Sequence, residues 1–305
     1  MNLSYTDEQN LLRDSVSKFC LSDYDFETRM KSVQSEKGHN EEHWKLFAEL
    51  GWLAIPFAEE HGGLDGNDVD LSLMFEEFGK AIVVEPYLAN VVLGGGILKR
   101  SDLEDKSKYI EGIISGESQV SLANYEPTKG FNLANVDCEI SSDGNVNGLK
   151  TTVLNAQNAN YFVVFGKQED SYAFALVSKD AEGLNCTSYK TYDGFVSGDV
   201  KFNNCKAEAV FSTSNALDIL EETILDGLIC VSSEAVGAME KCYQLTIEYT
   251  KQREQFGQPL SKFQALQHRM VDMFMEAEFT KSFLLKVLAT HEIDEKRKLI
   301  YGLKN

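Results

Sequence analysis

The sequence predicts an α+β protein in three parts. These are an N-terminal all-α domain (residues 1–118), a middle antiparallel β-barrel or β-sandwich (119–212) and a C-terminal helical bundle (213–305) that is incomplete. Apolar residues recur at helical spacing in the first and last parts, whereas the middle part consists of short β-rich runs separated by glycine turns. The length of 305 residues also exceeds the usual size of one hydrophobic core.

Helical signals follow one another through the first part. A Thr-x-x-Gln capping box at 6–9 predicts the first helix start. A second helix is expected from about Glu41, in a segment that Pro56 closes because proline lacks a backbone donor. A third is expected over 69–78. The glycines at 94–96 follow no predicted strand and precede no Lys-Ser/Thr pair, so they indicate close helix packing or a kink rather than a phosphate loop.

The middle part reads as about ninety residues of sheet. Strand-like runs are predicted at 119–123, 136–140, 161–165, 172–177 and 199–202. Turns are predicted at four pairs of an acidic or amide residue with glycine, which are Asp143-Gly144, Asn147-Gly148, Glu182-Gly183 and Asp193-Gly194.

Two long helices dominate the last part. The first is expected from Ala216 to about Tyr249, or about 35 residues and about 50 Å at the α-helical rise. The second is expected from Phe263 to about His291, and a third begins near Asp294. Two long antiparallel helices do not enclose a core unaided, so we expect either another subunit or a further C-terminal segment to cover them.

The corner between the long helices is the candidate cofactor site. Residues 253–260 (REQFGQPL) contain a Gly-x-Pro break and offer a guanidinium, an aromatic ring and amides. The alternative makes Arg253 a solvated surface residue and Phe256 a core residue.

Composition excludes several classes of partner. A net charge of -19 argues against nucleic acid and anionic membranes, both of which need clustered Lys and Arg. The six cysteines show no metal-ligand spacing and are predicted to be reduced core residues. The first residues lack a signal-peptide pattern and no run reaches about 18 apolar residues, so a soluble, cytoplasmic protein is expected.

Three motifs, in this domain order, resemble the acyl-CoA dehydrogenase family. They are LGWLAIP with EHGG (50–56 and 60–63), LAN followed by Glu126-Pro127 (122–127), and AVG with R-x-QFG and FQ (235–237, 253–257 and 263–264). The likeness is greatest to the branch of pimeloyl-CoA dehydrogenase small subunits, at 24–27, 84–88 and 234–240.

The resemblance implies FAD-dependent α,β-dehydrogenation of an acyl-CoA, including a dicarboxylyl-CoA. A carboxylate would remove the α-proton while a hydride leaves Cβ for the flavin, and electrons would pass to electron-transfer flavoprotein or a similar acceptor. It also implies a homo-oligomer, either a dimer or a tetramer, or a hetero-oligomer with a large subunit.

The resemblance also assigns the cofactor contacts. It places the loop 122–131, with Leu122, Asn124, Tyr125 and Phe131, and the strand residues Thr152 and Leu154 along the flavin. Arg253 would reach the FAD pyrophosphate of a neighbouring subunit. The adenosine part would lie against Gln255, Phe256, Phe263 and Gln264.

Several positions depart from the family pattern. Phe131 replaces a serine that binds flavin and substrate, and Thr152 replaces a tryptophan. The catalytic base stays unassigned: most members carry it at a position expected beyond Asn305, and a minority carry it where this chain has Gly227. Asp226 is one residue away, about 100° around a helix, so it is not assigned.

We therefore expect the sequence to correspond to the front four-fifths of a family member, from a truncated gene, a shortened form or a subunit completed by a partner. Two alternative functions stay open. One is a non-catalytic subunit that shares a flavin site in a heteromeric dehydrogenase. The other is a flavin-dependent oxidase or monooxygenase on the same fold.

Overall fold

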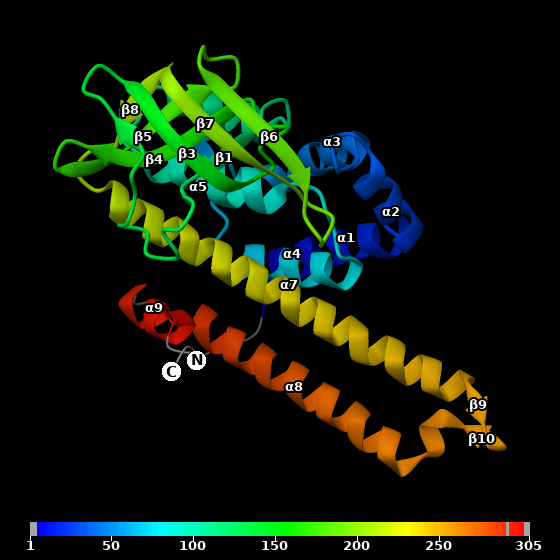
Figure 1. Cartoon of the computed structure of the whole chain (residues 1–305). Helices are drawn as coiled ribbons and strands as arrows, with labels where there is room; N and C mark the ends of the chain where they lie inside the picture. The colour runs from blue at the N-terminus through cyan, green and yellow to red at the C-terminus, as the bar shows by residue number, and fades with distance from the viewer. Residues whose placement is uncertain (1–4, 291–292, 302–305) are drawn as a thin grey trace. The chain divides into compact units, whose positions relative to one another are not determined.

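The computed structural model describes residues 5–290 and 293–301, and its chain forms two compact units (Figure 1). The helical unit comprises 1–29, 68–83 and 228–305, and the sheet unit comprises 30–67 and 84–227. The order of helical, β and helical segments confirms the predicted α+β class. The boundaries at 118 and 212 stay a prediction.

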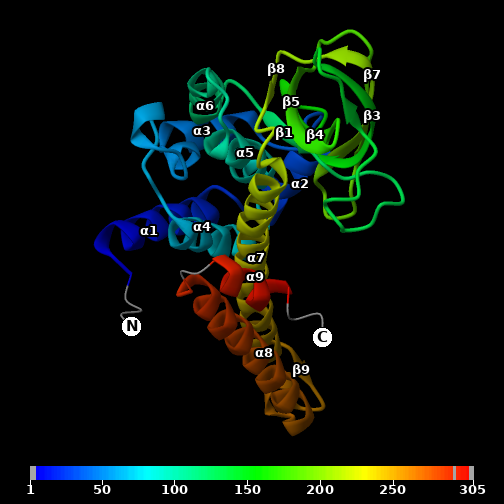
Figure 2. The same cartoon turned by 90° about the vertical axis from the view of Figure 1, so that its left-hand side faces the viewer.

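The sheet unit is built on one eight-stranded sheet that curls strongly (Figure 2). Its strand order is β6-β7-β3-β2-β4-β5-β8, with β1 added on β4. The strands are β1 (Val120–Ala123), β2 (Glu139–Ile140), β3 (Asn145–Leu154), β4 (Tyr161–Gln168), β5 (Ser171–Ser178), β6 (Leu184–Lys190), β7 (Val196–Lys206) and β8 (Ala209–Phe211).

The sheet corrects two predictions. β1 and β2 both pair in parallel with β4, so the sheet is not wholly antiparallel. The turn predicted at Asn147-Gly148 is wrong, because both residues lie inside β3 beside a register shift between Val146 and Gly148. A Cβ atom at Gly148 would lie 2.8 Å from Cys138 Sγ, so glycine serves close packing there rather than a turn. β6 and β8 were not predicted, and β3 was expected only at 152–154, from the family resemblance. β6 is polar and mostly exposed, without the alternation that marks a strand.

Short helices complete the sheet unit. They are α3 (Glu41–Glu49), η1 (Trp52–Ala54), η2 (Glu59–His61), the π-helical turn η3 (Leu88–Gly94), α5 (Gly95–Arg100) and α6 (Lys106–Ile114). A Cβ atom at Gly94 would lie 2.1 Å from the Val120 carbonyl oxygen, and one at Gly96 would lie 2.9 Å from Thr223 Cγ2. The glycine run therefore packs closely, as predicted.

The helical unit contains α1 (Asp7–Ser22), α4 (Asp68–Ala81), α8 (Gln264–Leu288), α9 (Ile293–Tyr301) and most of α7 (Ala216–Gln252). α2 (Phe26–Gln34) and α7 each run from one unit into the other. The capping box before α1 is confirmed, since Gln9 N–H donates to Thr6 Oγ1 at 3.2 Å and Thr6 N–H donates to Gln9 Oε1 at 3.1 Å. The long helices are also confirmed, whereas the predicted end at His291 lies outside the described residues.

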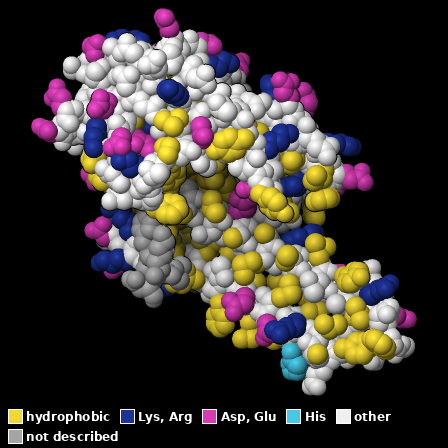
Figure 3. Space-filling model, in the orientation of Figure 1, with side chains coloured by type: hydrophobic (Ala, Val, Ile, Leu, Met, Phe, Trp, Pro, Cys, Tyr) yellow, Lys and Arg dark blue, Asp and Glu magenta, His cyan; other side chains and the backbone are white. Residues whose placement is uncertain are grey.

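Packing between the long helices is thin. A small core joins them (Ile229, Val236, Leu284 and Val287). Figure 3 shows hydrophobic side chains gathered over the α7–α8 hairpin. The exposed large apolar residues on these two helices are Val231, Leu245, Tyr249, Leu266, Val271, Phe274, Met275 and Phe279. The predicted covering of this face by another subunit or segment stays a prediction.

The burial of the cysteines and the apolar content of the helices test the expectations drawn from composition. None of the six cysteines, all of which lie in the described ranges, forms a disulfide, but only Cys138, Cys205 and Cys230 are buried. The core prediction is therefore wrong for Cys20 and Cys186, which are half-buried, and for Cys242, which is exposed. None of the helices in the described ranges is long and apolar enough to cross a membrane. Those same ranges hold no group of three His, Cys, Asp or Glu side chains placed to bind a metal.

Candidate functional site

The end of β1 and the strand β3 bring together the first group of predicted site residues. Leu122 is buried in β1 and pairs with Val163 of β4. Beyond β1, the Tyr125 carbonyl accepts a hydrogen bond from Thr151 N–H at 2.9 Å. Asn124 and Tyr125 therefore lie beside the strand that carries Thr152 and Leu154. That these residues line one ligand stays a prediction.

Two aromatic rings lie on this loop. The rings of Tyr125 and Phe131 meet edge to face, with centroids 6.4 Å apart. Phe131 is 82% exposed, which leaves its face available for contact. Burial raises the pKa of the Tyr125 hydroxyl, and a hydrogen bond with the Asn124 side chain opposes the rise. Tyr125 is therefore a neutral group at the inner end of the loop.

A second irregularity of β3 shapes the strand side. The register shifts between Lys150 and Val153, and Thr152 has φ +54°, a left-handed conformation that β-branched residues rarely adopt. Asp199 stabilises this bulge, since its Oδ1 accepts from Thr151 Oγ1 at 2.6 Å and from Thr152 N–H at 3.2 Å. These hydrogen bonds, led by that of Thr151, lower the pKa of Asp199. Strain of this kind is characteristic of functional sites.

The bulge is followed by an unsatisfied hydroxyl. Leu154 pairs with Ser197 of β7, and Ser197 Oγ is buried without a hydrogen-bond partner among the described residues. Buried polar groups are usually paired, so this hydroxyl suits an internal water molecule.

One charged residue next to this group, Lys150, was not predicted from the sequence. Lys150 is completely buried in β3, and its Nζ lies 2.7 Å from Glu126 Oε1. The signal was its even spacing from Val146, which places both residues on the inward face of the strand.

The corner between the long helices holds the second group. β9 (Glu254–Gln255) and β10 (Gln258–Pro259) form a two-residue hairpin around Phe256 and Gly257, with φ +55° and +77°. Positive φ at both positions is the type I′ pattern. Leu260 N–H donates to the Arg253 carbonyl at 2.8 Å and closes the corner.

This corner presents the Arg253 guanidinium and the Phe256 ring to solvent, whereas Phe263 is half-buried. The Arg253 side chain is exposed and makes no hydrogen bond or ion pair within the described residues. Phe256 is 92% exposed, so the alternative that made it a core residue is wrong. Its ring meets that of Phe263 edge to face at 6.2 Å. Gln255 and Gln264 are exposed on the same corner, giving it the chemistry to bind an anion beside a flat heterocycle.

The two groups lie in different units. No described residue is assigned as the catalytic base. Asp226 Oδ2 lies 2.6 Å from Arg100 Nη2, and Arg100 also approaches Glu222. Asp226 is therefore engaged in an ion pair within the sheet unit, and Gly227 beside it has no side chain.

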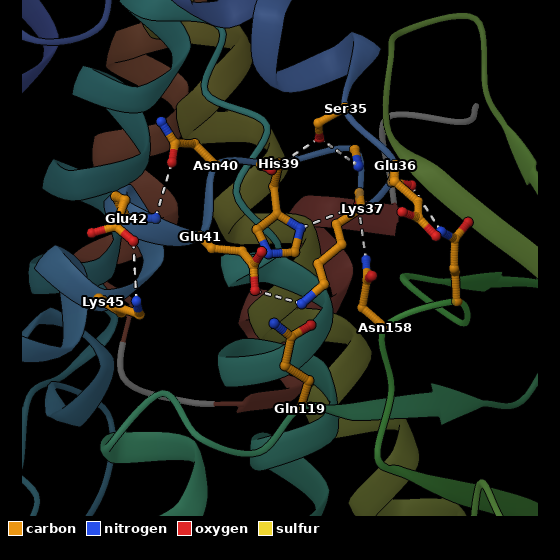
Figure 4. Close-up of polar contacts among 12 residues, drawn as sticks. Ser35, Glu36, Lys37, His39, Asn40, Glu41, Glu42, Lys45, Gln119 and Asn158 are labelled. Carbon is orange, nitrogen blue, oxygen red and sulfur yellow. Dashed lines mark hydrogen bonds and ion pairs between the residues drawn. The ribbon is translucent and has the colours of Figure 1, made fainter.

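A separate polar pocket of about 280 Å³ lies in the sheet unit. Asn158 Nδ2 donates to the Lys37 carbonyl at 2.9 Å, and Lys37 Nζ pairs with Glu41 at 2.5 Å (Figure 4). His39 Nδ1 lies 3.2 Å from the Lys37 carbonyl, so it must donate. Burial lowers the pKa of His39. These contacts attach the segment before α3 to the sheet, so the pocket is a structural junction rather than part of the group at β1 and β3.

Comparisons with known proteins found similarity to one protein family in both the N-terminal and the C-terminal parts of the chain. The family model described as "Acyl-CoA dehydrogenase, N-terminal domain" matches residues 6–117, and "Acyl-CoA dehydrogenase, C-terminal domain" matches 217–302. The chain is 29% identical over 306 residues to "Probable acyl-CoA dehydrogenase YngJ" of Bacillus subtilis, covering 94% of this chain and 80% of the relative.

Solved structures agree on the fold. The FAD complex of PigA superposes with a TM-score of 0.88 at 22% identity, covering 99% of this chain and 85% of that one. Butyryl-CoA dehydrogenase of Megasphaera elsdenii superposes with a TM-score of 0.84 at 20% identity, covering 99% and 86%. Both domain models, together with the likeness to the Bacillus relative over 94% of this chain, lead to one conclusion: the chain belongs to the acyl-CoA dehydrogenase family.

Proposed function

We propose that this chain binds FAD and serves in the α,β-dehydrogenation of an acyl-CoA thioester. The observation that carries the proposal is the hydrogen bond from Thr151 N–H to the Tyr125 carbonyl at 2.9 Å, because it aligns the two segments predicted to lie along the flavin. Family membership supports the reaction class, as do relatives named as acyl-CoA dehydrogenases.

The group formed by the loop 122–131 and the strand residues Thr152 and Leu154 has donors and surfaces that fit FAD. Bound FAD would supply the hydride acceptor. The rings of Tyr125 and Phe131 and the side chains of Leu122 and Leu154 would exclude water from its ring system. Asn124 and Thr152 would hold its polar edge.

The corner group fits the other end of the cofactor. Arg253 would bind the pyrophosphate of FAD held by a neighbouring subunit, through charge-assisted hydrogen bonds. Phe256, Phe263, Gln255 and Gln264 would line the adenosine part. The proposal therefore includes a homo-oligomer, or a hetero-oligomer with a large subunit, and the exposed apolar face of the α7–α8 hairpin supports it.

The proposal also names a substrate class and an electron acceptor. The likeness to pimeloyl-CoA dehydrogenase small subunits suggests a dicarboxylyl-CoA or another polar acyl-CoA. Phe131 in place of the family serine supports a substrate other than an ordinary fatty acyl chain, since a hydroxyl donor is replaced by an exposed ring. Electron-transfer flavoprotein is the proposed acceptor.

Cofactor analysis tests the proposal first. The purified chain should release FAD on denaturation, identified by its visible spectrum and by mass. Anaerobic addition of an acyl-CoA should then bleach the flavin of an active form. Protein that neither carries nor takes up FAD contradicts the proposal.

A second candidate is a non-catalytic subunit that shares a flavin site with a partner. The ion pair of Asp226 with Arg100 favours it, because it occupies the carboxylate nearest to the base position on α7. The purified homomer would then bind FAD without oxidising any acyl-CoA. Turnover with an artificial electron acceptor excludes this candidate.

A further inference from the structure

Glu126 and Lys150 form a buried ion pair at the base of the loop between β1 and β2. Lys150 Nζ lies 2.7 Å from Glu126 Oε1, and the two side chains are 0% and 5% exposed. Lysine is almost never fully buried without a partner, because an unpaired charge in the interior is costly. Lys150 has no exposed side-chain surface, and both carboxylate oxygens of Glu126 accept hydrogen bonds within the protein, so any role in binding must act through other residues.

The pair joins both ends of the loop to β3. Glu126 Oε2 accepts from Asp137 N–H at 2.7 Å, and Oε1 accepts from Cys138 N–H at 2.9 Å. Lys150 Nζ also donates to the Asn124 carbonyl at 3.3 Å. The irregular segment from 124 to 138 is thus closed on itself by one carboxylate, and a lysine of β3 holds that carboxylate in place.

Besides any effect on stability, this ion pair fixes the positions of the backbone groups to which it is hydrogen-bonded. Apolar side chains of similar volume can replace a buried ion pair without loss of stability in many proteins. They cannot hold the Asn124 carbonyl or the two backbone N–H groups at the loop end. The links therefore determine where Asn124 and Tyr125 lie relative to Thr152.

We propose that Glu126 and Lys150 are positioning residues, which make FAD affinity depend on an ion pair that does not touch FAD. This inference rests on the proposed function, because it takes the loop to lie along the flavin. It predicts that the pair controls cofactor retention separately from folding.

The double variant E126Q/K150M tests the inference. It leaves no buried charge without a partner, and the glutamine side-chain oxygen can still accept a hydrogen bond from a backbone N–H. We expect a folded protein whose thermal midpoint stays within about 5 °C of the wild type. Its dissociation constant for FAD should rise at least about tenfold, since small misplacements of binding groups are costly. Flavin fluorescence during titration of the apoprotein measures the affinity, and visible circular dichroism reports the flavin environment.

The matched control is K45M, which removes an exposed lysine that pairs with Glu42 at 3.0 Å in the same unit. It should bind FAD as the wild type does. A double variant that binds FAD as tightly as K45M overturns the positioning role alone. A wild-type apoprotein that takes up no FAD overturns the proposed function, and this role with it.

Hydrogen exchange on the wild-type apoprotein keeps the inference testable if the double variant does not fold. The amides of Asp137 and Cys138 should be protected to a degree comparable with those of β3, whereas residues 128–135 exchange faster. Exchange of Asp137 and Cys138 at the rate of the surrounding loop would show that the carboxylate does not hold the loop end, and would overturn the role.

Discussion

Gly237 of α7 lies directly against the backbone of Glu76 in α4, so that a Cβ atom at Gly237 would lie 1.8 Å from the Glu76 carbonyl oxygen. The contact is reciprocal, because a Cβ atom at Gly79 would lie 2.0 Å from the carbonyl oxygen of Glu234. The two helices therefore cross with their backbones touching. Gly237 belongs to the AVG motif in the sequence, and this crossing gives a physical reason for its glycine.

Substitution of Gly237 should destabilise the helical unit. In G237A the methyl group would overlap backbone atoms, which cannot move aside as a side chain can, so we expect a loss of at least about 2 kcal/mol. Urea unfolding measures it. G227A on the same helix is the control, because its nearest neighbour is the flexible end of Leu93, at 2.9 Å. It should stay within about 1 kcal/mol of the wild type. Equal stability of both variants would contradict the steric explanation.

Arg253 should contribute strongly to FAD affinity. R253A removes a guanidinium that has no partner within the described residues, and we expect affinity to fall roughly 10- to 100-fold, as for loss of a charge-assisted hydrogen bond. R253K keeps the positive charge but lacks the planar guanidinium, so its FAD affinity should lie between those of the wild type and R253A. Titration of oligomeric apoprotein with FAD measures both. The control K251A removes an exposed lysine paired with Glu248 at 3.0 Å. If K251A weakens FAD binding as much as R253A does, the affinity depends on the net charge of this region, and a direct contact of Arg253 with FAD is contradicted.

Phe256 should show opposite effects on stability and binding. Its φ of +55° is unfavourable for phenylalanine, whereas Asn-Gly is the preferred pair for this hairpin turn. F256N should therefore raise the free energy of unfolding by about 0.5–1 kcal/mol. It should also weaken FAD binding, because the ring pair with Phe263 is lost. Unfolding and FAD titration of the same preparation test both effects, and a variant that gains stability while keeping full affinity refutes a binding role for the ring.

His39 should make the sheet unit less stable in mild acid. Burial is the main cause that lowers the pKa of His39 below its ordinary value of 6.5, although Glu85 opposes the shift. The unfolded chain therefore binds a proton below pH 6.5 that the folded chain does not bind until lower pH. Stability should fall as pH drops through this window, by at most about 1.4 kcal/mol per pH unit, and should not depend on this group above it.

The variant H39Q should flatten that acid-side slope, measured by urea unfolding at several pH values. H268Q, at an exposed position on α8, is the control and should leave the slope unchanged. An unchanged slope in H39Q would assign the acid sensitivity to other groups.

Helical features were predictable because their signals are local. The capping box at Thr6 and the apolar period of α7 depend only on residues within a few turns, so the structure confirms both. The strand containing Asn147-Gly148 was not predictable in this way. That pair favours a turn in isolation, but pairing with β7 and the close approach of Cys138 select an extended bulge.

The sequence alone determined the α+β class, the long helical hairpin and the residues to examine at its corner, because periodicity, caps and motif spacing are properties of neighbouring residues. The tertiary structure alone decided that Tyr125 pairs with Thr151, that Lys150 is buried against Glu126 and that Phe256 is exposed. Each of these depends on segments that meet only when the sheet or the hairpin forms, since burial and long-range pairing are properties of the assembled chain.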